Sequence, residues 1–128
     1  MKKLQKRIYE YSNARGWHKL APGDLAKAIM IEGAELLEHF QWDNPTLYEV
    51  KKDKEKIKKL ASELADVFIY AIELGTELGL DLDKVIEEKL KHAEKKYPAG
   101  LMKKITRRDG AGRGAEYWEI KKKYRREN

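Results

Sequence analysis

Apolar residues recur at intervals of three and four along most of the chain, which is the spacing of an amphipathic helix. The pattern is clearest over residues 48–78, where it predicts one long helix. The apolar stripe of that helix comprises Ile57, Leu60, Ala61, Leu64, Val67, Phe68, Ala71, Gly75 and Leu78. The same spacing predicts helices over residues 2–14, 24–42 and 82–96, and no segment alternates as a strand does. Four helices with short connectors indicate an all-α fold, a four-helix bundle.

Capping residues and prolines mark the connectors. We expect Asp24 to be the N-cap of the second helix. Pro45 is expected to break the chain after that helix, because a proline disfavours helical geometry in the residue before it. Pro98 follows the end of the fourth helix. These signals predict a helical domain over residues 1–98 and an extension over residues 99–128.

The extension carries the whole positive excess of the chain. Residues 1–98 hold 18 basic and 18 acidic side chains, residues 99–128 hold 10 and 4, and the net charge is +6. Tyr117, Ile120 and Tyr124 have the spacing of one helical face, which is compatible with a short fifth helix. A basic run with aromatic rings also leaves a non-enzymatic alternative open, a nucleic-acid-binding or interaction module that uses this tail.

Composition narrows the chemistry further. The chain has no cysteine, which excludes disulfides, zinc–thiolate sites and thiol catalysis. Its N-terminus lacks the apolar run of a signal peptide, and no segment has eighteen consecutive apolar residues. We therefore expect a cytoplasmic protein that does not enter a membrane.

Carboxylates recur at intervals of three residues on two of the predicted helices. "IEGAELLEHFQW" (residues 31–42) places Glu32 within the apolar stripe, Glu35 beside it and Glu38 further round. "SELADVFIY" repeats the spacing of three with Glu63 and Asp66. Residues three apart lie about 60° apart around a helix, so each pair can converge on one point. If the two helices pack antiparallel, the pairs face each other.

Four carboxylates in one partly buried site repel each other strongly. One pair of like charges at about 4 Å costs on the order of 4 kcal/mol at an effective dielectric constant of 20. Either some carboxyl pKa values rise or a cation lies among them. Ligands that are all oxygen favour a hard divalent ion such as Mg²⁺, Mn²⁺ or Ca²⁺.

Two other interpretations of the acids remain. Glutamates three apart on a charged helix are often solvated surface residues, although two pairs beside the core stripe favour a metal site. A di-iron carboxylate bundle needs a histidine three residues after a glutamate on two helices. Here Glu38 and Asp66 occupy those positions and His39 is four residues from Glu35, so oxygen-only ligation fits the sequence better.

At these motifs the chain resembles a known family. "EGAELLEHFQW" followed by "ELADVFIY" is similar to the MazG-like nucleoside triphosphate pyrophosphohydrolases of the all-α NTP pyrophosphatase superfamily. "HFQW" and the later "KYP" resemble its dCTP pyrophosphatase-like branch most, and the resemblance covers about residues 4–98. It implies hydrolysis of an NTP or dNTP to the monophosphate and pyrophosphate, as in control or sanitation of the nucleotide pool.

The resemblance also implies roles for individual residues. Glu32, Glu35, Glu63 and Asp66 would bind Mg²⁺, with Mn²⁺ as the alternative, and Glu35 or Glu38 would take a proton from the attacking water. The phosphate-binding residue would be Lys89, although from the sequence alone it is as readily a surface lysine. The residues near the nucleotide would be Trp17, Trp42 and Tyr70, where ordinary packing at helix ends is the alternative for the two tryptophans.

Two further points concern the family pattern. Members often have an asparagine four residues after the lysine that Lys89 matches, and this chain has Ala93 there. Relatives are dimers or tetramers whose sites are lined by more than one subunit. The resemblance therefore implies a homo-oligomer, and the long stripe of the third helix agrees with it.

Overall fold

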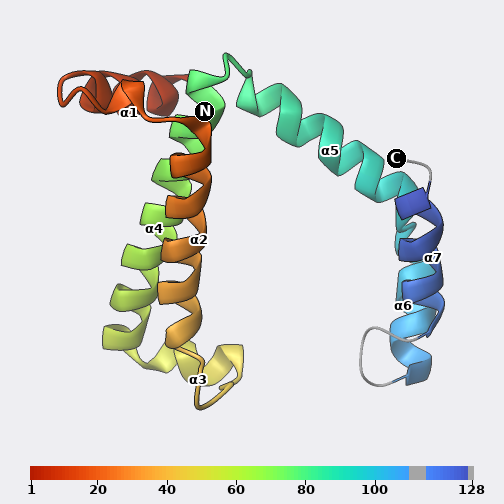
Figure 1. Ribbon diagram of the computed structural model, residues 1–128. Helices are drawn as coiled ribbons and strands as arrows, with labels where there is room; N and C mark the ends of the chain where they lie inside the picture. The colour runs from red at the N-terminus through yellow and green to blue at the C-terminus, as the bar shows by residue number, and fades with distance from the viewer. Residues whose placement is uncertain (110–114, 127–128) are drawn as a thin grey trace. The chain divides into compact units, whose positions relative to one another are not determined.

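The computed structural model describes the backbone of residues 1–109 and 115–126 and the side chains of residues 1–104 and 117–125. The described residues contain no strand, which confirms the prediction of an all-α fold. The elements are α1 (Lys2–Asn13), the 3₁₀ helix η1 (Trp17–Lys19), α2 (Pro22–Glu38), α3 (Leu47–Lys52), α4 (Lys54–Glu77), α5 (Leu82–Lys96), α6 (Ala99–Asp109) and α7 (Ala115–Arg126) (Figure 1).

The start of α2 differs from the sequence prediction. Asp24 is not the N-cap, because α2 begins at Pro22 and Ala21 is its N-cap. A proline is favoured at the first helical position, where the missing N–H would have no partner inside the helix. Asp24 therefore lies in the first turn, where its charge is favourable to the helix dipole.

The long helix predicted over residues 48–78 is two helices. Asp53 ends α3 and caps α4, and its carboxylate accepts a hydrogen bond of 2.8 Å from the Lys56 backbone N–H. Thr46 and Glu49 form a capping box at the start of α3, directly after the break expected at Pro45. Apolar periodicity missed the break because it continues in step on both sides of Asp53.

The chain divides into two compact units, residues 1–83 and 84–128, and α5 begins in the first and continues in the second. In the first unit α2 and α4 lie antiparallel and side by side along most of their length (Figure 1). The other elements of this unit are attached to that pair: α1 and α3 pack on α4, and η1 packs on α1. The domain boundary predicted at residue 98 stays a prediction.

The core of the first unit is small. Its buried apolar side chains among the described residues are Ile8, Leu25 and Ile72, one each from α1, α2 and α4. The predicted apolar stripe is only partly interior, since Ile57, Leu64, Phe68 and Leu78 are 40–56% exposed. The stripe therefore leaves apolar surface outside this small core.

Polar contacts fix α1 across α4. Ser12 Oγ donates a hydrogen bond to the Glu73 carboxylate, and both side chains are buried. One turn further along α4, the Gln5 amide donates to Thr76 Oγ1 (3.3 Å) and to the Leu80 carbonyl (3.1 Å). These bonds hold α1 against the C-terminal half of α4.

The second unit is held together by aromatic contacts. Tyr97 and Tyr117 stack with ring centroids 5.3 Å apart, and His92 meets Tyr124 edge-on at 5.9 Å. The helix α7 confirms the short helix that the spacing of the tail predicted, whereas α6 was not expected. Over the described part of the chain, no helix combines the length and the apolar character needed to cross a membrane.

Candidate metal centre and adjoining pocket

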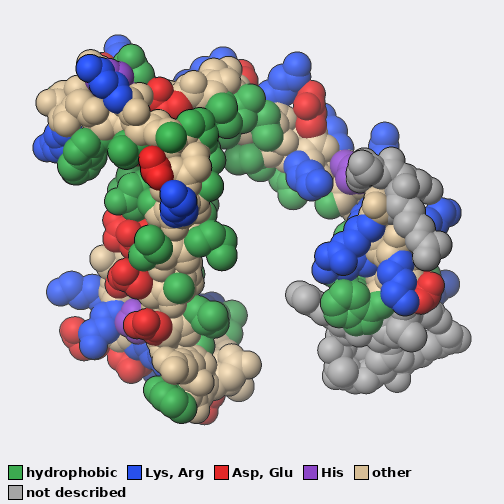
Figure 2. All heavy atoms as spheres, in the orientation of Figure 1, with side chains coloured by type: hydrophobic (Ala, Val, Ile, Leu, Met, Phe, Trp, Pro, Cys, Tyr) green, Lys and Arg blue, Asp and Glu red, His purple; other side chains and the backbone are tan. Residues whose placement is uncertain are grey.

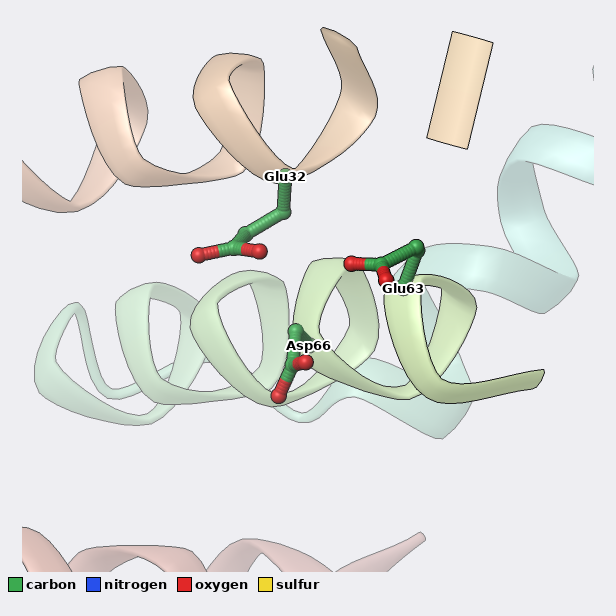
Figure 3. Close-up of side chains that lie close together, drawn as sticks. All are labelled: Glu32, Glu63 and Asp66. Carbon is green, nitrogen blue, oxygen red and sulfur yellow. The ribbon is translucent and has the colours of Figure 1, made fainter. Parts of the chain in front are cut away.

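Three carboxylates meet where α2 packs against α4. Glu32 points from α2 toward α4, which carries Glu63 and Asp66 one turn apart (Figure 3). One oxygen from each residue lies within 4.8 Å of the other two. All three side chains are half-buried. The antiparallel packing of the two helices thus brings together acids that are more than thirty residues apart in sequence.

The cluster is electrostatically unfavourable without a cation. The pKa of the Glu32 carboxyl is raised, first by burial and then by the negative charges of Glu35, Asp66 and Glu63. Among the described side chains, neither Glu32 nor Asp66 forms an ion pair with a lysine or arginine. Half-buried carboxylate oxygens that carry an excess of negative charge fit a hard divalent cation.

Glu35 and Glu38 lie outside the group of three. Glu35 is exposed, but it is close enough to Glu32 that its charge raises the Glu32 pKa more than Asp66 or Glu63 does. Glu38 is exposed at the last position of α2. The structure therefore brings three of the four predicted ligands together and leaves Glu35 beside them with its oxygens free of the cluster.

His39 is a neighbour of this cluster that the sequence analysis did not assign. Its Nε2 lies 4.0 Å from Glu63 Oε1, and the two side chains are about one-quarter exposed. His39 is the C-cap of α2, so the end of that helix places the imidazole beside the acids. A protonated His39 would partly offset the charge of Glu63.

A pocket of about 730 Å³ adjoins the acids between α1, η1 and α4. Asp66 belongs both to the acid cluster and to the pocket wall. The remaining lining residues are mostly apolar or aromatic: Met1, Leu4, Arg7, Ile8, Tyr11, Trp17, Ala65, Phe68, Ile69, Tyr70, Ile72 and Glu73. A mostly apolar cavity with a few polar groups is the usual form of a small-molecule site.

Two of the three predicted nucleotide-binding residues line this pocket. Trp17 is 45% exposed and meets Tyr11 edge-on, with ring centroids 5.8 Å apart. Burial, followed by the charges of Glu32 and Asp66, raises the pKa of the Tyr70 hydroxyl, which places this ring near the acids. Trp42 does not line the pocket and is 90% exposed in the turn after α2.

The predicted phosphate-binding residue, Lys89, belongs to the second unit. It is exposed in the middle of α5. Its role stays a prediction, as do the roles assigned to the other site residues.

The sequence analysis missed Glu73 and Ser12. Glu73 follows Asp66 by seven positions and Tyr70 by three, so all three residues share one face of α4. That spacing was visible in the sequence. The partner of Glu73 was not, because Ser12 lies 61 positions away and only the packing of α1 on α4 joins them.

A family model supplies the identification. The MazG-like family model matches residues 27–109, which include both acidic motifs and all of α5. The chain belongs to the MazG-like family. This confirms the resemblance derived from "EGAELLEHFQW" and "ELADVFIY", whereas the dCTP pyrophosphatase-like branch stays a prediction.

A solved structure agrees with the MazG-like assignment. The crystal structure of a pyrophosphatase from Archaeoglobus fulgidus is 34% identical in sequence, with a TM-score of 0.66. The similarity covers 77% of this chain and 92% of that one. No curated protein sequence is similar enough to count as a match. The MazG-like chain thus shares the fold of a solved pyrophosphatase over most of its length.

Proposed function

We propose that this MazG-like protein hydrolyses a nucleoside or deoxynucleoside triphosphate to the monophosphate and pyrophosphate, with Mg²⁺ or Mn²⁺ as cofactor. Family membership and the A. fulgidus pyrophosphatase support a hydrolase that acts on phosphoanhydrides. The observation that carries the proposal is the convergence of Glu32, Glu63 and Asp66 within 4.8 Å. Sanitation of the nucleotide pool is a role that this reaction would serve.

Glu32, Glu63 and Asp66 would hold the metal, with Glu35 as a further ligand. When bound, the ion would offset the charge of the phosphates and lower the pKa of a coordinated water. The packing of α2 on α4 holds the three carboxylates near one another. That arrangement concentrates negative charge where the metal ion of a metal–triphosphate complex would supply positive charge.

A carboxylate that keeps at least one oxygen not bound to the metal is needed to take the proton of the attacking water. Glu35 is exposed and adjacent to Glu32, which makes it the first candidate, and Glu38 is the alternative one turn further along α2. The water oxygen forms a bond to the α-phosphorus, the bond from this phosphorus to the bridging oxygen breaks, and pyrophosphate leaves. The proton passes to the carboxylate.

The pocket beside Asp66 suits the nucleoside. Trp17 and Tyr70 are aromatic walls on which a base can stack, and Asp66 joins that wall to the metal ligands. Lys89 is the proposed phosphate contact. Trp42, at 90% exposure, can contact the base only if another chain or the ligand covers it.

We also propose that the protein acts as a homo-oligomer, dimer or tetramer. Large apolar side chains remain exposed on α2, including Met30 (72%) and Leu37 (67%), which are seven positions apart on one face. Figure 2 shows hydrophobic side chains at the surface over α2 and α4 beside the acidic ones. Exposed apolar surface of this kind marks an interaction site.

The direct test is pyrophosphate release from a panel of ribo- and deoxynucleoside triphosphates, with and without Mg²⁺. We expect metal-dependent release, and Glu32→Gln and Asp66→Asn should each lower the rate at least ~100-fold, the scale of lost electrostatic stabilisation. Glu77→Gln, an exposed acid of α4, is the matched control. No release from any nucleotide would refute the enzyme and leave the nucleic-acid-binding alternative.

A further inference from the structure

Glu73 is a carboxylate in the wall of a mainly apolar pocket. Its side chain is only 5% exposed, and Ser12, its hydrogen-bond donor, is fully buried. Among the described side chains, no lysine or arginine pairs with Glu73. Burying a carboxylate is costly unless its oxygens are well satisfied, so its place in this pocket calls for a functional explanation.

Ser12 satisfies only part of the hydrogen-bond-accepting capacity of the Glu73 carboxylate. An ionised carboxylate has about four acceptor positions on two oxygens and no donor. The Ser12 hydroxyl uses one position on Oε1. The remaining positions can accept N–H groups of a ligand that enters the pocket, and they repel a ligand's carbonyl oxygens.

Glu73 stands at the right distance from the acid cluster to meet the far end of a nucleotide. Asp66, Tyr70 and Glu73 follow each other at four and then three positions on one face of α4. Seven residues correspond to about 10 Å along the helix axis. A nucleotide whose phosphates meet Asp66 and its partners would therefore place its base beside Tyr70 and Trp17, with one edge toward Glu73.

We propose that Glu73 selects nucleobases that present an amino group. This inference rests on the proposed function and names its substrate class. Cytosine, adenine and guanine carry an exocyclic N–H₂ that can donate to the carboxylate, whereas thymine presents a carbonyl acceptor. Uracil and hypoxanthine likewise have a carbonyl or hydrogen where cytosine and guanine have the amino group.

Two substrate pairs test the amino group. The members of the pair dCTP and dUTP differ at position 4 of the pyrimidine and at N3, which is an acceptor in cytosine and an N–H donor in uracil, whereas those of dGTP and dITP differ only by the 2-amino group. We expect the wild-type enzyme to favour the amino member of at least one pair by tenfold or more in kcat/KM. Equal kcat/KM values within both pairs would overturn the proposal without any variant.

Glu73→Gln tests the carboxylate itself. The amide can donate to a carbonyl, so the preference for the amino member should fall at least tenfold or reverse. Glu77→Gln, four residues further along α4 and exposed, should retain the wild-type ratio. Ser12→Ala removes the same interhelical hydrogen bond but keeps the acid, and it should also retain the preference. An unchanged ratio in a folded Glu73→Gln enzyme, or equal losses in Glu73→Gln and Ser12→Ala, would contradict base selection.

Measurements of nucleotide binding test the role of Glu73 independently of the proposed reaction. Calorimetric titration of the wild-type protein with dCMP and dUMP, and with dGMP and dIMP, is carried out in a chelator, so no turnover is needed. Tighter binding of an amino-bearing monophosphate, lost in Glu73→Gln, supports base selection even if no triphosphate is hydrolysed. Turnover without any such difference would retain the enzyme and reject the role of Glu73.

Discussion

The surroundings of Glu32 change the pKa of its carboxyl group. Burial and three neighbouring acids raise its pKa above the ordinary value of 4.5, so the folded chain without metal binds a proton there more tightly than the unfolded chain does. Stability from this group is then fully present below the unfolded pKa and is lost as pH rises through the folded pKa. A metal ion bound at Glu32 would reverse this preference for the protonated carboxyl, because the ion stabilises the charged carboxylate.

Removing the charge of Glu32 should therefore stabilise the metal-free protein. We expect Glu32→Gln in a chelator to have a higher melting temperature than wild type at pH 7 and a similar one near pH 4. Melting curves at several pH values between 4 and 8 measure the difference, and Glu77→Gln is the control. A difference that stays constant with pH would contradict the raised pKa.

At the scale of elements, Asp53 decides where one helix ends and the next begins. Its carboxylate caps α4 through the Lys56 N–H at 2.8 Å. We expect Asp53→Ala to lower the free energy of unfolding by about 1 kcal/mol, and Asp53→Asn to have little effect because asparagine caps equally well. Denaturant unfolding compares the two variants, and equal losses would assign the effect to charge rather than to capping.

The proposed metal binding would act on the α2–α4 pair. Because the proposed ligands come from both helices, a bound ion would join them. Saturating Mg²⁺ at about 100 times its Kd would add about 2.7 kcal/mol to the free energy of unfolding. We expect millimolar Mg²⁺ to raise the melting temperature of wild type and to have little effect on Asp66→Asn. An unchanged wild-type melting temperature would favour solvated acids.

At the scale of the whole molecule, the exposed apolar face of α2 predicts self-association. Introducing charge by Met30→Lys with Leu37→Lys should shift the sedimentation coefficient to a smaller species, because an interface would then bury two cations. Lys27→Gln, exposed on the same helix, should sediment as wild type does. Wild-type protein that sediments as a monomer at micromolar concentration would refute the oligomer.

Local patterns predicted much of this protein. Apolar spacing located α1, α2, α4, α5 and α7, because each helix has one face more apolar than the other. Spacing of three marked Glu32 with Glu35 and Glu63 with Asp66 as candidate ligands, and the same motifs led to the MazG-like family. The break at Asp53 was missed because capping depends on one side chain and leaves the apolar period intact.

Other features required the tertiary structure. The antiparallel packing of α2 on α4 selected Glu32, Glu63 and Asp66 as the converging group and left Glu35 beside it, because convergence depends on where two helices face each other. The tertiary structure also distinguished the two tryptophans, because Trp17 lies in the pocket wall and Trp42 is exposed to solvent. The contact between Ser12 and Glu73 exists only because α1 crosses α4. Sequence thus determined which residue types recur on which helical faces, and packing between distant segments decided which of them meet.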